Sequence, residues 1–156
     1  MTSRERVLAA LRREEPDRVP YFEIGIDRAL AQKLMSWEES ESQATDLETN
    51  LYSVEEAKAI SSFLQMDNIY YFMCAPIYAH IQPGQDARPF YGDGMIQSEA
   101  DLSLLQFPDP HDDALYTEAE QFVTQKEDYA SCFVTAIGIF PTILSMGWES
   151  FSVALH

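Results

Sequence analysis

Apolar residues recur along this chain in two spacings, one typical of amphipathic helices and one typical of short buried strands. Thr2 and Glu5 fit a capping box before a first helix, which Pro16 is expected to end. Ser53 and Glu56 fit a second capping box before another helix. The predicted inner face of that second helix is Val54, Ala57, Ile60 and Leu64.

Three short runs have the composition of strands. Residues 18–24 contain Pro20 near their beginning, where a missing N–H is tolerated. Residues 68–73 are rich in aromatic and β-branched residues without clean alternation, the pattern of a strand covered on both faces, and residues 130–137 predict a third buried strand. Helical patterns separate the three runs, so we predict βαβ units of a parallel sheet with right-handed crossovers.

The remaining segments carry turn and cap signals. Residues 79–97 contain Pro-Gly and Gly-Asp-Gly turns and predict a hairpin-like excursion or an ordered loop. Pro141 suits the first turn of a last helix, which is predicted to continue through Phe151 to the end of the chain. The side chains predicted to begin the other helices are Asp27, Ser98 with Asp101, and Asp112 or Asp113.

The chain is long enough for one domain with a core, and its balance of charge is strongly acidic. Its 156 residues include 10 Lys and Arg against 26 Asp and Glu, a net charge of −16. That charge argues against nucleic-acid binding and against docking on anionic lipid. Cys74 and Cys132 form no CxxC pair and are predicted to be buried, reduced thiols. No apolar stretch approaches the ~18 residues of a membrane span, so the cytoplasm is the expected location.

Several stretches together resemble one protein family. They are Ser3–Leu11 followed by Pro16–Pro20, Ser98–Leu102 with Phe107–Pro110, Gly138–Thr142, and Gly147–Phe151. In these stretches and their order the chain is similar to uroporphyrinogen decarboxylase-like proteins, and nearer to the cobamide-dependent methyltransferase branch than to the decarboxylases. The resemblance implies a TIM-type (β/α) barrel, which needs eight strands and about 250 residues. We therefore expect residues 1–156 to form an α/β N-terminal part of such a barrel, with about three parallel strands and their helices.

Three positions depart from what the resemblance implies for decarboxylation. The decarboxylases hold substrate carboxylates with arginines near the first strand, where this chain has only Arg28. Cys74 stands at the place of an aspartate that binds pyrrole N–H groups, and Met146 falls near the place of a tyrosine. These departures count against uroporphyrinogen as the substrate. Decarboxylation of uroporphyrinogen III in tetrapyrrole biosynthesis stays an alternative.

The methyltransferase branch implies zinc, bound by His and Cys thiolate, which activates a thiol for methyl transfer from a corrinoid. Those ligands would lie in the second half of the barrel, beyond His156, so zinc and corrinoid are expected only for a complete barrel. Cys74 and His80 are six positions apart, a spacing with little specificity for metal. A small molecule or a corrinoid protein would be the substrate of the completed enzyme.

A third hypothesis is a non-catalytic fragment or subunit that works only by association. The chain stops inside a predicted helix with no Gly or Pro stop signal, which predicts a truncation or a partner that supplies the remainder. The third strand would leave a hydrophobic edge uncovered, so we expect self-association or a complementing chain.

Six residues are candidates for binding a substrate, whereas no catalytic residue is identified. Glu23 would end the first strand, where barrel active-site groups lie, or would be a salt-bridged carboxylate. Side chains after the second strand would line the same mouth, and a helix N-terminus after the third would offer N–H groups to an anion, unless its glycine only serves the turn. The full set is Glu23, Cys74, Tyr78, His80, Gly138 and Thr142.

Overall fold

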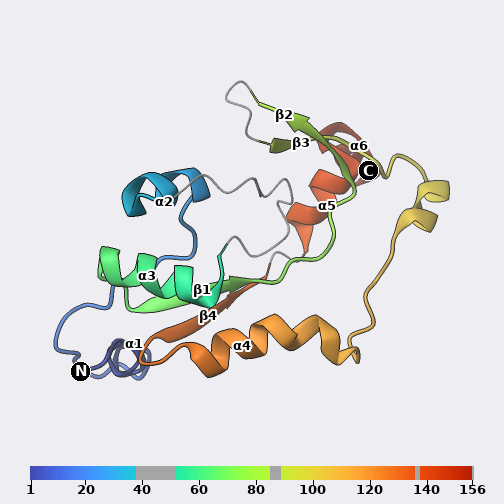
Figure 1. Cartoon of the computed structure of the whole chain (residues 1–156). Helices are drawn as coiled ribbons and strands as arrows, with labels where there is room; N and C mark the ends of the chain where they lie inside the picture. The colour runs from blue at the N-terminus through green and yellow to red at the C-terminus, as the bar shows by residue number, and fades with distance from the viewer. Residues whose placement is uncertain (38–51, 85–88, 136–137, 156) are drawn as a thin grey trace. The chain divides into compact units, whose positions relative to one another are not determined.

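A computed structural model describes residues 1–37, 52–84, 89–135 and 138–155 of the chain. The chain divides into two compact units (Figure 1). Within the described residues, the first unit comprises residues 1–37, 52–72 and 110–134, and the second comprises residues 73–84, 89–109, 135 and 138–155. Each unit contains its own two-stranded sheet.

The first unit is built on a parallel pair of strands, β1 (Asn68–Phe72) and β4 (Ala130–Val134). The pairing confirms the second and third predicted strands and their parallel direction, and it makes the chain a mixed α/β protein. The register runs from Asn68 opposite Ala130 to Phe72 opposite Val134. The helical elements of this unit are α1 (Ser3–Leu11), α2 (Arg28–Met35), α3 (Val54–Leu64), η2 (Asp113–Tyr116) and α4 (Thr117–Gln125) (Figure 1).

Side chains on both faces of β1 are covered, as the lack of alternation predicted. Ile69 has no exposed surface. Tyr71 packs on Phe122 of α4, with ring centroids 5.1 Å apart, whereas Tyr70 meets the edge of Tyr52 at 6.3 Å. Because successive residues of a strand point to opposite faces, these contacts place the core of the first unit on both sides of β1.

The helices α1 and α3 begin at the residues that the capping signals in the sequence predicted. Capping boxes are formed by Thr2 with Glu5 at α1 and by Ser53 with Glu56 at α3. The predicted inner face of α3 is confirmed at Val54, Ala57 and Ile60, which are buried. Leu64 is only half-buried, and Ser61 is buried instead because its hydroxyl donates to the carbonyl of Asn68 at 2.7 Å.

The first predicted strand, residues 18–24, is wrong, because the segment forms no ladder with β1. Three bonds that involve side chains, together with one backbone bond, take the place of the ladder. The amide of Asn68 donates to the carbonyl of Glu23 at 2.7 Å and accepts from the N–H of Glu23 at 3.1 Å. Asp67 likewise accepts from the N–H of Tyr21 at 2.8 Å and donates its own N–H to the carbonyl of Tyr21 at 2.8 Å.

The prediction of about three parallel strands in part of a barrel is therefore corrected to one parallel pair, β1 and β4. Tyr21 and Glu23 meet Asp67 and Asn68 in the same order along the chain, so the segment runs beside β1 in the parallel direction. Within the described residues the two sheets have two strands each, and neither closes into a barrel.

The second unit contains an antiparallel hairpin of β2 (Ala79–Pro83) and β3 (Pro89–Gly94), which confirms the predicted excursion. Its helical elements are η1 (Glu99–Leu104), α5 (Ile139–Met146) and α6 (Trp148–Ala154) (Figure 1). Ser98 and Asp101 begin η1 as predicted, and the N–H of Ser98 donates to Asp101 Oδ2 at 2.7 Å. The hairpin packs on α5 so closely that a Cβ at Gly94 would lie 2.4 Å from the backbone nitrogen of Gly147.

The single last helix predicted from Pro141 onward is wrong, because Gly147 divides it into α5 and α6. Gly147 has φ 79° and ψ 151°, a conformation essentially restricted to glycine. Its N–H still donates to the carbonyl of Ile143 at 2.8 Å, which ends α5.

Candidate functional site

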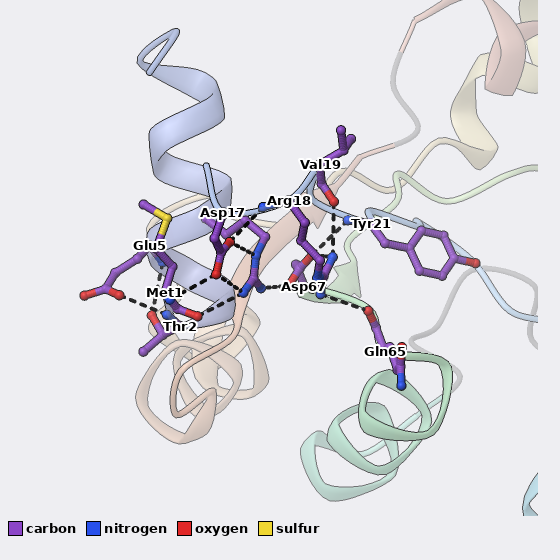
Figure 2. A network of polar contacts seen from close by, with 10 residues as sticks. Met1, Thr2, Glu5, Asp17, Arg18, Val19, Tyr21, Gln65 and Asp67 are labelled. Carbon is purple, nitrogen blue, oxygen red and sulfur yellow. Dashed lines mark hydrogen bonds and ion pairs between the residues drawn. The ribbon is translucent and has the colours of Figure 1, made fainter. Parts of the chain in front are cut away.

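The carboxylate of Asp67 has no exposed surface and accepts hydrogen bonds from several donors (Figure 2). Arg6 donates to it from Nη1 at 2.5 Å. Arg18 donates from Nη1 and Nη2 at 2.7 and 2.9 Å, and the N–H of Tyr21 donates at 2.8 Å. These bonds join α1, the following loop and the residue that precedes β1.

Asp17 extends this cluster toward the surface. It accepts from Nε and Nη2 of Arg6 at 2.6 and 2.9 Å, and from the amino group of Met1 at 3.1 Å (Figure 2). The guanidinium of Arg6 therefore bridges two carboxylates. Its planar arrangement of N–H donors is well suited to such a bridge. We call Arg6, Asp17, Arg18 and Asp67 the arginine–aspartate cluster.

The protonation states of the cluster are fixed by these bonds. Burial alone would raise the pKa of Asp67, but hydrogen bonds from the backbone of Tyr21 and from Arg6, Ser3 and Arg18 outweigh it and hold the pKa below its usual value. The hydrogen bond from Arg6 lowers the pKa of Asp17. Both carboxylates are therefore ionised at neutral pH and fully occupied by donors, so they are poorly placed to exchange protons with a substrate.

Sequence reasoning did not single out Asp67. The available signal was an acidic residue directly before a buried strand, with arginines at positions 6 and 18 that had no assigned partner. A carboxylate in such a place requires paired cations. The partners lie 49 and 61 positions away from Asp67, so spacing alone could not identify them.

Glu23 belongs to the first unit and lies beside Asn68, the first residue of β1. The side chain of Glu23 is half-buried, and its Oε1 accepts from the N–H of Ile24 at 3.3 Å. The strand that Glu23 was expected to end is absent. Its contribution to a binding site stays a prediction.

Cys74, Tyr78 and His80 belong to the second unit. The hydroxyl of Tyr78 accepts from the N–H of Gln106 at 2.6 Å and lies 3.2 Å from the carbonyl of Gln106, and its own N–H donates to Ser145 Oγ at 3.0 Å. Tyr78 therefore links the hairpin to α5 and to the residues after η1. Cys74 is half-buried in the segment after β1, whereas His80 is exposed and lies within β2.

Gly138 and Thr142 lie at the start of α5, as predicted. Gly138 precedes the helix with φ 95° and has open space around the position of a Cβ. Thr142 is exposed, and its hydroxyl donates back to the carbonyl of Gly138 at 3.0 Å. The structure therefore brings these two candidates into contact with each other.

The three positions that bear on decarboxylation have ordinary surroundings. Arg28 pairs with Glu56 at 2.8 Å, and its guanidinium lies 5.3 Å from the ring centroid of Tyr52. Cys74 is half-buried, and Met146 lines a hollow in the second unit. No three His, Cys, Asp or Glu side chains among the described residues could hold a metal ion. This part of the chain therefore does not fit zinc.

The hollow has a volume of about 600 Å³ and lies between η1 and the helices α5 and α6. Five of its ten lining residues are apolar and five are polar, and two of the polar residues are glutamates. Its lining includes Ile96, Leu102, Met146, Val153, Glu99 and Glu149. None of the six predicted site residues lines it.

Comparison of the chain with known protein families, with curated proteins and with solved structures found no match. Among the helices that the structure describes, none is both long and apolar enough to cross a membrane.

Proposed function

We propose that this chain is the N-terminal part of a uroporphyrinogen decarboxylase-like barrel whose complete form transfers a methyl group from a corrinoid to a thiol. In this proposal the chain supplies scaffold, and the reactive groups come from the remaining strands. The observation that carries it is the arginine–aspartate cluster. That cluster joins two of the stretches on which the resemblance rests, Ser3–Leu11 and Pro16–Pro20, to the start of β1.

In this proposal Arg6, Asp17 and Arg18 stabilise the fold and take no part in the reaction. Arg6 comes from α1, and Asp17 and Arg18 come from the loop that follows it. Their charges are neutralised on one another and on Asp67 rather than directed at a ligand. A scaffold role also agrees with the parallel pairing of β1 and β4, whose connection includes the hairpin and ends in α4, because parallel strands connected through helices build a (β/α) barrel.

Methyl transfer is favoured over decarboxylation by the state of Arg28. A decarboxylase needs cationic groups that are available to substrate carboxylates. Arg28 already pairs with Glu56 and lies over the ring of Tyr52. The chain's net charge of −16 would also repel a substrate with many carboxylates.

The proposal is tested by completing the barrel. The chain is mixed with the C-terminal half of a methyltransferase of this family, together with zinc, methylcobalamin and a thiol, and the methylated thiol is measured by mass spectrometry. We expect product only when both chains are present. The matched controls are the chain carrying Asp67→Asn, which should not assemble, and the chain carrying Asp128→Asn, an exposed aspartate of the same unit, which should.

Three outcomes would contradict the proposal. Methyl transfer by this chain alone would place the reactive groups within it. An assembled complex with no methyl transfer would reject the assigned reaction. Release of carbon dioxide from uroporphyrinogen by that complex would favour the decarboxylase alternative instead.

A further inference from the structure

We propose that the hollow in the second unit, called here the η1–α6 groove, binds a basic amphipathic helix of a protein partner. The proposal rests on the shape and charge of that groove and does not depend on methyl transfer. It concerns the second unit alone, because every residue that lines the groove belongs to that unit.

The groove has an apolar floor with apolar side chains on both walls. Ile96 is buried at the floor, Leu102 comes from η1, and Val153 comes from α6. Leu102 is 50% exposed and Val153 is 70% exposed. Aliphatic surface left in water costs about 25 cal/mol per Å², so a partner that covers these side chains gains free energy from their burial.

The walls of the groove are held together before any partner arrives. Gln97 donates from Nε2 to the carbonyls of Gly94 and Met146, both at 2.7 Å. Its Oε1 accepts from the hydroxyl of Ser150 on α6 at 2.5 Å. The N–H of Ile96 donates to the carbonyl of Ser145 at 2.9 Å. A preformed groove of this kind loses little conformational entropy on binding.

The charges of the groove specify a cationic partner. Glu99 on η1 and Glu149 on α6 are both exposed, and neither makes an ion pair within the described residues. The described part of the second unit contains no Lys or Arg. Its carboxylates are Asp93, Glu99, Asp101, Asp109 and Glu149. A second copy of this surface would bring like charges together, so pairing of two grooves is disfavoured.

An extended helix suits the apolar surface better than a compact ligand does. Outside the groove lining, Leu104 in η1 is 41% exposed and Phe107 is 82% exposed. A helix that places apolar residues at i, i+3, i+4 and i+7 would cover Leu102 and Val153 and direct its lysines or arginines to Glu99 and Glu149. This is the way an amphipathic helix binds an apolar groove.

The test uses two fluorescent peptides of identical composition, each about 15 residues of leucine and lysine. One places all leucines on a single helical face, and the other distributes them around the helix. Binding to the unmodified chain is measured by fluorescence anisotropy at about 0.15 M salt, where long-range attraction to an acidic protein is screened. We expect the amphipathic peptide to bind at least about tenfold more tightly than the scrambled one.

Charge-reversed variants locate the site. Glu99→Lys with Glu149→Lys is compared with Glu14→Lys with Glu15→Lys, which changes the net charge equally on exposed residues of the first unit. The groove pair should lose most of the binding, whereas the control pair should retain it.

Other results would overturn the proposal. Equal binding of the two peptides, or equal loss in both variants, would mean that only non-specific charge attraction operates. A dimer of the unmodified chain that the groove pair abolishes would make a second copy the occupant. The peptide comparison uses the unmodified chain, so it decides the question even if a variant fails to fold.

Discussion

Asp67 combines complete burial with a full negative charge, a costly arrangement that requires compensation from its neighbours. Arg6 and Arg18 supply opposite charge, and the N–H of Tyr21 supplies a further donor. The pair Arg6–Asp67 is the more buried of the two, because Arg18 keeps 45% of its side chain exposed. Asp67 therefore controls how α1 and the following loop attach to β1.

Removing the charge of Asp67 is expected to destabilise the first unit strongly. Asp67→Asn leaves Arg6 without one of its counterions in a buried place, at a cost of about 3 kcal/mol in the free energy of unfolding. Urea denaturation measures that change. Asp128→Asn removes the same charge from an exposed position and should change stability by less than about 0.5 kcal/mol. Equal effects of the two substitutions would show that the cluster contributes nothing specific.

The same carboxylate should make stability depend on pH. Because the pKa of Asp67 is lower in the folded than in the unfolded state, its contribution is fully present above the unfolded value of about 4 and is lost as pH falls through the folded value. The stability difference between the wild type and Asp67→Asn should be largest near neutral pH and should shrink below about pH 4. Urea denaturation of both proteins from neutral pH to below about pH 4 measures this stability difference. A difference that stays constant would contradict the depressed pKa.

At the scale of helices and strands, some elements could be predicted from the sequence and others could not. Capping boxes and the turns of the hairpin depend on residues a few positions apart, so Thr2 with Glu5 and the β2–β3 excursion were predicted correctly. Residues 18–24 have strand composition, yet the side chains of Asp67 and Asn68 take the bonds that a ladder would use. Composition cannot reveal a competition of that kind.

Close contact between the hairpin and α5 provides a test of the second unit. Gly94→Ala would place a methyl group about 2.4 Å from the backbone of Met146 and Gly147, so the hairpin must move away. We expect a loss of about 2 kcal/mol, with faster hydrogen exchange in β2 and β3 but not in β1 and β4. Gly25→Ala meets no atom within 4 Å and should leave exchange in these strands unchanged. Unaltered exchange in the Gly94 variant would contradict the packing.

At the scale of the whole molecule, the sequence predicted a mixed α/β chain with parallel strands, and β1 with β4 confirms that much. A barrel was not found, because the described residues contain one parallel pair and one antiparallel hairpin. The six residues of the candidate site stay predictions. Glu23 lies in one compact unit and Cys74, Tyr78, His80, Gly138 and Thr142 in the other, whereas the densest polar contacts involve residues whose partners are distant in sequence.

The scaffold role is the central claim, and the methyl-transfer assay of the completed barrel tests it most directly. The account expects a methylated thiol from methylcobalamin when this chain and the C-terminal half of a methyltransferase of the family are combined with zinc, and none from either chain alone. A complex that assembles without transferring the methyl group, or transfer by this chain without its complement, would contradict the account.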